Sequence, residues 1–339
     1  MRLPLRRFVI PLALGMGGLL VVGAIAGVLV VRDEDPAARG DAIAYSCKER
    51  GNAWYAICVM ETDGTDKRRV TARLTTSEPV WSPDSRRIAF TRNEDVGEFS
   101  TFTEDDVFVM GADGDDQQQL TPEEDGWMSG QPSWSPDGRE IAFVRGESVA
   151  TSVPSRFGDL HVMSEDGVDA RLLVRGPLRD PSWSPDGREI VFTRGLNLAS
   201  QDASMDLYVV GATGGTPRQL TRTPAGVFET APAWSPDGLR IAFARWTNLT
   251  QFDGKATLHM IDRDGTNERL VLAHMHFASG PSKLAWSADG RTIAFETSPA
   301  LECTAIHLVG VASGRVRPLT SCTKKRDSVL APSWQPARP

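Results

Sequence analysis

The stretch of sequence that decides the fold is a twelve-residue segment that returns along the chain. It first reads Pro79-Val-Trp-Ser-Pro-Asp-Ser-Arg-Arg-Ile-Ala-Phe90, and then Pro132-Ser-Trp-Ser-Pro-Asp-Gly-Arg-Glu-Ile-Ala-Phe143. Copies follow at 181–192, 232–243 and 284–295, and a truncated copy begins at Pro332. The tryptophans of the six copies are Trp81, Trp134, Trp183, Trp234, Trp286 and Trp334. Because they recur every 48 to 53 residues, the sequence predicts an array of similar units, such as propeller blades.

Each period contains four short strand signals, which we call A, B, C and D in chain order. In the third copy they span 181–183, 189–193, 206–210 and 218–221. They are rich in β-forming residues and are separated by turn residues. The A–B link is Ser-Pro-Asp-Gly, a tight turn, and its aspartates are Asp84, Asp137, Asp186, Asp237 and Asp289. Four antiparallel strands per period are typical of a propeller blade.

The two ends of the repeat region complement each other. A B-like strand at 42–46 has no A strand before it, and an A-like strand at 332–334 has no B strand after it. Together these two strands would complete one blade and close a ring of six. The expected fold is therefore an all-β, six-bladed propeller over residues 41–339, with its N- and C-terminal strands in one shared blade.

The repeat also resembles a known family. The segment Trp-Ser-Pro-Asp-Gly-x-x-Ile-Ala-Phe, followed by a hydrophobic strand, Asp-Gly and Arg-x-Leu-Thr, resembles the WD40-like PD40 repeat of TolB-type propellers. The resemblance covers about Asp41 to Pro339. It implies an interaction module of the cell envelope. Propellers of prolyl-oligopeptidase-like peptidases also use this repeat, so the fold does not fix an activity.

The N-terminal segment predicts attachment to a membrane. Three arginines within the first seven residues precede an uncharged stretch at 8–31. As a helix this stretch would span about 36 Å, enough to cross a bilayer core of about 30 Å. We expect residues 1–31 to be a cytoplasmic N-terminus and a single-pass signal anchor, with a linker at 32–40 and the propeller outside the cytoplasm. Cleavage after Ala24-Ile25-Ala26 would instead release a secreted or periplasmic protein.

The four cysteines suggest disulfides, because an even number of cysteines in an exported chain is usually paired. Proximity in sequence favours the bridges Cys47–Cys58 and Cys303–Cys322 among the three connectivities. Four reduced, buried thiols are the alternative. A tetrahedral zinc site is disfavoured, since the spacings contain no C-x₂₋₄-C pair.

The sequence offers no catalytic set. A net charge of −7 argues against nucleic acid as a partner. There is neither a Gly-x-Ser-x-Gly elbow nor a phosphate-binding glycine loop. His161, His259 and His307 occupy the same position in three of the expected C strands, which indicates a packing position. We therefore expect no enzyme activity, no metal and no cofactor.

The binding site is expected on the face that carries the B–C and D–A connections, because the longest loops lie there. These loops are 93–106, 146–158, 195–205 and 247–256, and the first is strongly acidic. Residues just before each A strand should surround the mouth of the central channel. These candidates are Glu78, Gln131, Asp180, Glu229, Thr230, Lys283 and Leu330, together with His274 and His276 in a neighbouring loop.

Three functions compete at this stage. The first is a monomeric propeller that binds another envelope protein. The second is a binding or sensory domain for a small polar molecule or glycan at the channel mouth. The third, an enzyme with its active site in the propeller, is the least favoured, because no acid–base or metal set converges.

Overall fold

The structure is a computed structural model of the 339-residue chain. It describes residues 42–48, 55–72, 75–94, 104–122, 126–147, 157–198, 200, 202–247, 255–276, 282–300, 303–321 and 328–336. All of them belong to one compact unit, Asp35–Pro339. The predicted anchor at 8–31 and the linker at 32–40 lie outside the described residues. Among the residues that are described, no helix is long and apolar enough to cross a membrane.

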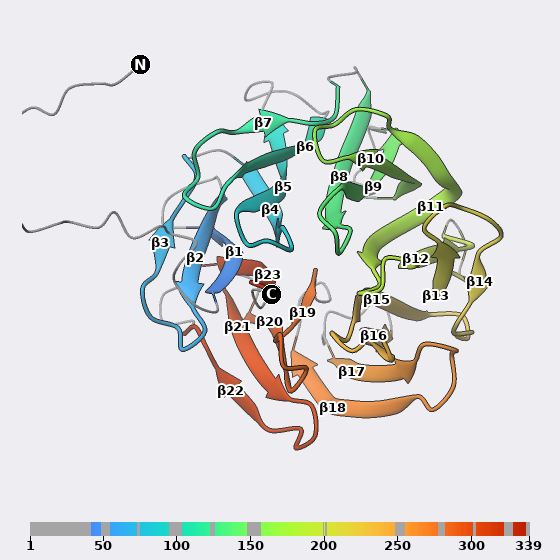
Figure 1. Ribbon diagram of the computed structural model, residues 1–339. Coiled ribbons are helices and arrows are strands. Elements are labelled where there is room, and N and C mark those ends of the chain that lie inside the picture. Colours follow the sequence, from blue (N-terminus) through green and yellow to red (C-terminus); the bar gives the residue numbers. More distant parts are fainter. Residues whose placement is uncertain are drawn as a thin grey trace, which may run out of the picture. The chain divides into compact units, whose positions relative to one another are not determined.

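The described residues form a ring of sheets (Figure 1). Three of these sheets have four strands each. Their strands are β1 (Ala42–Lys48), β2 (Ala56–Glu61), β3 (Arg68–Arg69), β4 (Thr75–Trp81), β5 (Arg87–Glu94), β6 (Glu104–Gly111), β7 (Gln118–Gln119), β19 (Leu284–Trp286), β20 (Thr292–Ala300), β21 (Cys303–Gly310), β22 (Val316–Pro318) and β23 (Ser328–Trp334). They pair in the orders β23-β1-β2-β3, β4-β5-β6-β7 and β19-β20-β21-β22.

The remaining eleven strands form one sheet, in which β14 lies off the main hydrogen-bonded path and pairs with β13. They are β8 (Trp127–Trp134), β9 (Glu140–Glu147), β10 (Gly158–Ser164), β11 (Arg171–Trp183), β12 (Glu189–Leu196), β13 (Ser204–Gly211), β14 (Arg218–Gln219), β15 (Val227–Trp234), β16 (Arg240–Thr247), β17 (Lys255–Asp262) and β18 (Arg269–His276). All these pairings are antiparallel except one parallel bridge, between Met205 of β13 and Phe228 of β15.

Strand β11 differs from expectation. The sequence predicts a D strand and a separate A strand here, but β11 runs unbroken from Arg171 to Trp183. Its first part pairs with β10 and its last part with β12. Gly176, at a φ of 138°, lies between the two parts, where a residue without a side chain accommodates the change of direction.

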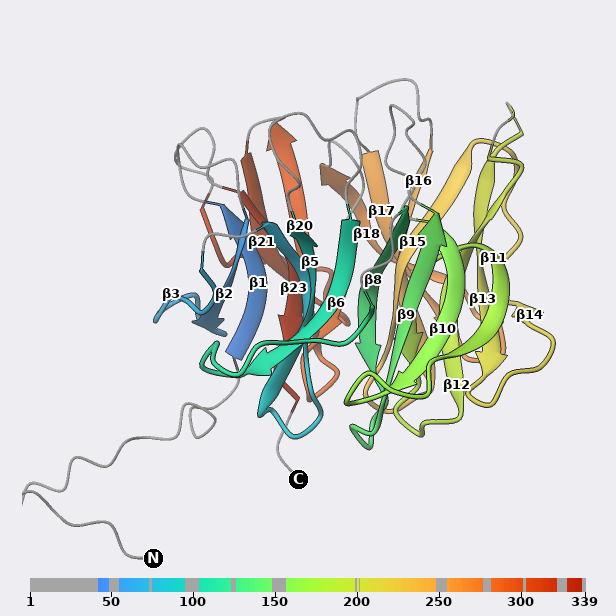
Figure 2. The same ribbon diagram turned by 90° about the horizontal axis from the view of Figure 1, so that it is seen from above.

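The B–C connections are shorter than the sequence suggests. Gly195 pairs with Met205 and Leu196 with Ser204, so the hairpin of β12 and β13 extends into the predicted loop 195–205. Likewise, Glu94 pairs with Glu104. The B strands end and the C strands begin on one face of the ring, and the A–B and C–D turns lie on the other (Figure 2). This division follows from the alternating direction of the strands.

The A–B turns owe their shape to a serine and an aspartate. The Ser82 hydroxyl donates to Asp84 Oδ1 at 2.6 Å and accepts from the Arg87 amide at 2.9 Å. The same bonds recur at Ser135, Ser184, Ser235 and Ser287. Ser85, which replaces glycine in the first copy, adopts a φ of 61° and donates its hydroxyl to Pro336 O at 3.3 Å.

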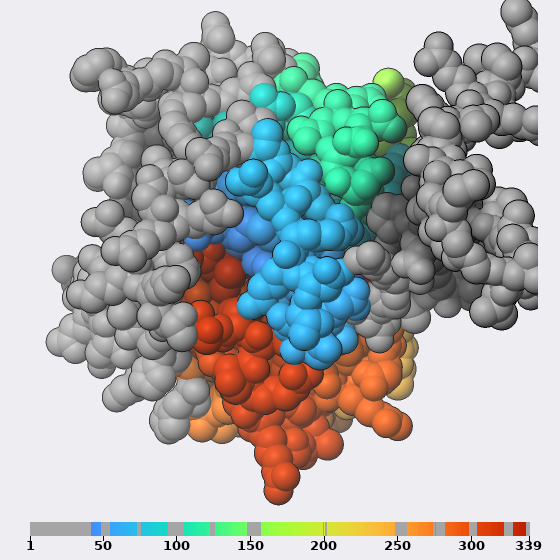
Figure 3. All heavy atoms as spheres, turned by 90° about the vertical axis from the view of Figure 1, so that its left-hand side faces the viewer, coloured from blue at the N-terminus to red at the C-terminus, as the bar shows by residue number. Residues whose placement is uncertain are grey.

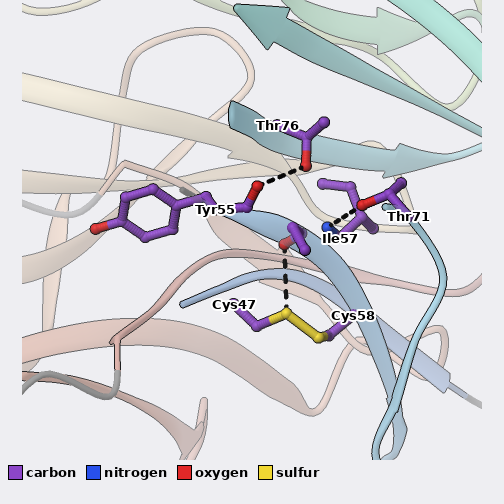
Figure 4. Close-up of a disulfide and its surroundings, with 7 residues drawn as sticks. Cys47, Tyr55, Ile57, Cys58, Thr71 and Thr76 are labelled. Atoms are coloured by element: carbon purple, nitrogen blue, oxygen red, sulfur yellow. Dashed lines mark hydrogen bonds between the residues drawn. A yellow bond between two sulfur atoms is a disulfide. The ribbon is translucent and has the colours of Figure 1, made fainter. Parts of the chain in front are cut away.

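Where a threonine follows a short D strand, its side chain attaches that strand to the neighbouring C strand. The hydroxyl of Thr121 accepts from the Val107 amide at 3.0 Å, and that of Thr221 accepts from the Leu207 amide at 2.9 Å. In the sheet of β1 and β2, Thr71 accepts from the Ile57 amide in the same way (Figure 4). Strands β3, β7 and β14 are only two residues long. The threonine side-chain bond extends the attachment of each of them beyond its backbone hydrogen bonds.

The hydrophobic core lies mainly between adjacent sheets. One cluster joins Ala44 and Ile57, from the sheet of β1 and β2, to Trp81 and Phe90 of the next sheet. In all B–C strand pairs except β1–β2, a B-strand ring packs on a C-strand ring, as Phe143 does on His161 with centroids 5.5 Å apart. His259 and His307 occupy this same packing position, against Phe243 and Phe295.

The ring closes through its two ends. Strand β1 pairs with β23, with Ile43 opposite Trp334. The Ala42 amide donates to Gln335 Oε1 at 3.0 Å, and the Gln335 amide donates to Ala42 O at 2.8 Å. The predicted all-β propeller is thereby confirmed, including the pairing of its first and last strands.

Candidate functional site

The candidate site lies at the centre of the ring, where the A strands face one another. It has a volume of about 460 Å³. Residues three positions before a repeat tryptophan line it: Glu78, Gln131, Asp180, Ala231 and Lys283. The tryptophans Trp81, Trp183, Trp234, Trp286 and Trp334 also contribute to its wall. We call this space the central cavity.

The backbone turns sharply at these positions. Glu78, Gln131, Asp180, Ala231 and Ala331 all have φ between 50° and 59°. A proline follows each of them, and the pairing with the B strand shifts register at the same place. Left-handed residues other than glycine cost free energy, so the surrounding contacts must hold this bulge. It turns the side chain at this position towards the centre.

A chain of hydrogen bonds supplies those contacts. Glu78 Oε2 accepts from the Gln131 amide at 3.0 Å. Gln131 Oε1 accepts from the Asp180 amide at 2.6 Å, and Asp180 Oδ2 accepts from the Ala231 amide at 3.1 Å. Each side chain thus holds the bulge of the next A strand. Because Ala231 has no acceptor on its side chain, this chain of bonds ends there.

A buried glutamate takes over this role near the ring closure. Glu296, on β20, accepts at Oε1 from the Ser282 amide and hydroxyl at 2.9 and 2.8 Å, and at Oε2 from the Ala331 amide. Burial raises the pKa of this carboxyl above its ordinary value, and its hydrogen bonds oppose that shift. Nothing in the repeat pattern selects Glu296, since the equivalent B-strand positions hold Thr91 and Val144.

Lys283 is the cation of the cavity. Its Nζ lies 3.5 Å from Pro132 O, across the ring. Burial lowers the pKa of Lys283 to about 8, although the charges of Glu78 and Asp180 act to raise it. A lysine whose pKa lies near physiological pH can change charge when a ligand enters. Glu78, Asp180 and Lys283 therefore form a polar set of mixed charge.

The other predicted residues lie elsewhere. Glu229 is buried on β15, where its Oε1 accepts from Arg245 Nη2 at 2.5 Å and its Oε2 accepts from the Thr221 hydroxyl. Burial raises the pKa of Glu229. Thr230 is buried beside it. In this A strand it is Ala231 that reaches the cavity, one residue later than expected, because the bulge sets the register.

The two loop histidines cannot be assigned. His274 and His276 fall in strand β18, not in a loop, and their side chains lie outside the described residues. In the described part of the chain, no three histidine, cysteine or acidic side chains are grouped as metal ligands would be.

Comparisons with known proteins now place the fold. A model of the family described as TolB beta propeller domain matches residues 95–246. The crystal structure of TolB from Acinetobacter baumannii superposes with a TM-score of 0.67 and 18% identity, covering 87% of this chain and 67% of that one. This chain contains a TolB-type propeller. A putative TolB from Agrobacterium tumefaciens has a TM-score of 0.58 and 16% identity, with 88% and 100% covered.

The same fold also occurs in an enzyme. An oligogalacturonate lyase in complex with manganese superposes on the TolB-type propeller with a TM-score of 0.54 and 13% identity, covering 78% of this chain and 70% of the lyase. No curated protein sequence matches the chain. At these identities the likeness shows the fold alone.

Proposed function

We propose that the chain is a non-enzymatic, extracytoplasmic propeller that binds a segment of another envelope protein at its central cavity. Six blades are inferred from the pairings: one from β23 and β1–β3, one from β4–β7, one from β8–β11, one from β11–β14, one from β15–β18 and one from β19–β22. The TolB-type fold is consistent with an interaction module of this kind.

The observation that carries the proposal is the composition of the central cavity. At about 460 Å³ it lies within the range of pockets that hold a compact ligand. It offers carboxylate and amide oxygens, one cation and a wall of tryptophans, which suits the polar backbone and an apolar side chain of a short peptide segment. Much of the hydrogen-bonding capacity of Glu78, Gln131 and Asp180 already serves the ring, so Lys283 is the group best placed to recognise a partner.

Membrane attachment is part of the same proposal. The apolar segment at 8–31 would hold the propeller at the outer surface of the membrane. The Cys47–Cys58 disulfide is consistent with this location, because such bonds persist in oxidising compartments.

Cross-linking in the cells that produce the protein tests the proposal. The full chain, its Lys283→Met variant and a charge-matched Arg188→Met control would be compared by capture and mass spectrometry. Arg188 is exposed on an A–B turn, away from the cavity lining. One envelope protein captured by wild type and control, but lost with Lys283→Met, supports the proposal. Equal capture by all three chains contradicts it.

A small polar ligand is the second candidate, favoured by the limited volume of the cavity. If no protein is captured, thermal stabilisation by panels of sugars and amino acids would identify such a ligand. The manganese-bound lyase gives a reason to include Mn²⁺. Stabilisation by Mn²⁺ that Lys283→Met changes and Arg188→Met does not would contradict the expectation that no cofactor is needed.

A further inference from the structure

A second groove lies on the outer side of the ring, between the sheet of β1–β3 and the sheet of β19–β22. It has a volume of about 340 Å³ and is separate from the central cavity. The two chain segments that form it lie side by side in Figure 3, with β1–β3 in blue and β21–β22 in red. Four cations line it: Lys48, Lys67, Arg68 and Arg69.

These cations lack the partners that cations have elsewhere in the protein. Arg171 pairs with Glu140 at 3.0 Å, and Arg263 pairs with Asp186 at 2.7 Å. In contrast, among the described residues no carboxylate lies within ion-pair distance of the four groove cations, and none lines the groove. In a chain of net charge −7, this is a local concentration of uncompensated positive charge.

The repeat itself does not call for these residues. Arg69 pairs with Cys58 in the register where other D strands place Gln119, Leu172, Gln219, Leu270 and Pro318. At the position of Lys67 the other blades have Gln117, Ala170, Pro217, Glu268 and Val316. The fold therefore accepts neutral residues at both places, and an acidic one at the place of Lys67. A cation occupies these two positions only in the blade that borders this groove.

Hydroxyl groups complete the lining on the other side. The oxygen of Thr304 accepts from the Val329 amide at 2.7 Å, and that of Thr320 accepts from the Ile306 amide at 2.8 Å. A hydroxyl that accepts in this way keeps its own hydrogen for donation. Ser321 and Ser328 also line the groove. Cations and hydroxyl donors without acidic neighbours are the chemistry that binds phosphate oxygens.

The disulfide fixes the geometry of the groove. Cys47 and Cys58 both line it, and their bond joins β1 to β2 (Figure 4). Lys48 directly follows Cys47 in β1. Lys48 Nζ lies 5.1 Å from the centre of the Tyr55 ring, a cation–π contact that limits its movement. Arg68 is held by a 3.4 Å bond from Nη2 to Ala112 O. Two of the four cations are thus pre-positioned, while Lys67 and Arg69 are exposed.

From this arrangement we propose that the groove between the sheets of β1–β3 and β19–β22 binds a phosphate-bearing ligand. The phosphate lies between Lys67 and Arg69 on one side and the Thr304 and Ser328 hydroxyls on the other. Its source is either a soluble phosphate compound or the headgroup of an anionic lipid, since both present the same oxygens. This site is independent of the protein partner proposed for the central cavity.

The test measures binding to the full chain in neutral detergent at physiological ionic strength. The soluble probe is inorganic pyrophosphate, and the lipid probe is dihexanoyl phosphatidylglycerol, with dihexanoyl phosphatidylcholine as its uncharged counterpart. The groove variant is Lys67→Gln with Arg69→Gln. The control is Arg139→Gln with Arg188→Gln, which removes the same charge from exposed residues of A–B turns.

We expect wild type and control to bind at least one anionic probe with equal affinity, and the groove variant to bind it about tenfold more weakly, as for the loss of about 1.4 kcal/mol. Pyrophosphate binding would identify a soluble source, and phosphatidylglycerol binding alone a lipid source. The absence of saturable binding to both probes would overturn the proposal. Equal weakening in both double variants would also overturn it, because that result reflects overall charge.

Discussion

The amide of Asp180 donates a 2.6 Å hydrogen bond to the side-chain oxygen of Gln131, which belongs to the preceding A strand. Both residues have a left-handed backbone conformation, and both precede a proline. A side chain expected to face a ligand therefore holds the bulge of the next blade. Glu78, Gln131 and Asp180 thus have a structural role in the central cavity, because each accepts a hydrogen bond from the next A strand. Recognition of a partner is left mainly to Lys283.

Gln131→Ala should destabilise the protein by about 1–3 kcal/mol, since it leaves the half-buried Asp180 amide without its acceptor. Replacing the nearby Ser129, also buried on β8 but without this bond, by alanine should cost less. Urea unfolding measures both. Equal effects of the two substitutions would show that the link between the A strands contributes nothing beyond ordinary packing.

Two turn glycines should respond very differently to alanine. Both have positive φ, so each substitution costs about 1 kcal/mol through the backbone alone. A Cβ on Gly238 would meet nothing closer than Pro185 Cδ at 3.7 Å, whereas one on Gly114 would lie 1.8 Å from Val70 O. Thermal unfolding should therefore show a loss of about 3 kcal/mol or more for Gly114→Ala. Similar melting temperatures for the two variants would argue against the close contact at Gly114.

Removing the disulfide should weaken the blade that closes the ring. Cys47→Ala with Cys58→Ala opens a loop of 11 residues, for which a loss of about 2–3 kcal/mol is expected. Unfolding by denaturant, with and without a reductant, gives the comparison. A reductant should destabilise wild type and leave the double variant nearly unchanged. If it destabilises both equally, the sensitivity comes from another bond, such as the predicted Cys303–Cys322, whose second cysteine lies outside the described residues.

Lys283 should make stability depend on pH in an alkaline window. Its pKa falls from 10.5 to about 8 on folding, so the charged form is disfavoured in the folded state. Stability contributed by this group rises as pH increases from about 8 to about 10.5 and is constant below that window. Lys283→Met removes the effect. Its advantage over wild type should shrink across this window by on the order of 1–3 kcal/mol, after allowance for partial solvation. A pH-independent difference in unfolding free energy would contradict the shifted pKa.

The fold could be predicted from the sequence because each copy of the repeat contains the residues that form its own turns and strands. In each of five copies, the serine and aspartate of the A–B link form the hydrogen bonds of their own turn. Where a threonine follows a short D strand, it attaches that strand to the neighbouring C strand. The pairing of Ile43 with Trp334 could be inferred as well, since each end lacked the strand that the other supplied.

The site was accessible only in part. Glu78, Gln131, Asp180 and Lys283 do reach the central cavity, and the repeat register found them. The positions of the Glu229 and Glu296 side chains depend on contacts with distant residues. Glu229 accepts a hydrogen bond from Arg245, and Glu296 accepts one from the Ala331 amide, 35 residues away in sequence. Such contacts cannot be predicted from the repeat pattern, because they do not recur from one copy to the next. The outer groove was missed for a related reason, because its two walls come from opposite ends of the chain.

The pairing of β1 with β23 has a consequence for how the protein matures. Nearly 300 residues separate the two strands, so the ring cannot close until the segment at 328–334 has been synthesised. Until then β1 presents an unpaired edge, which is prone to join other chains. A chaperone that shields this edge during synthesis would shorten the interval in which misassembly can begin.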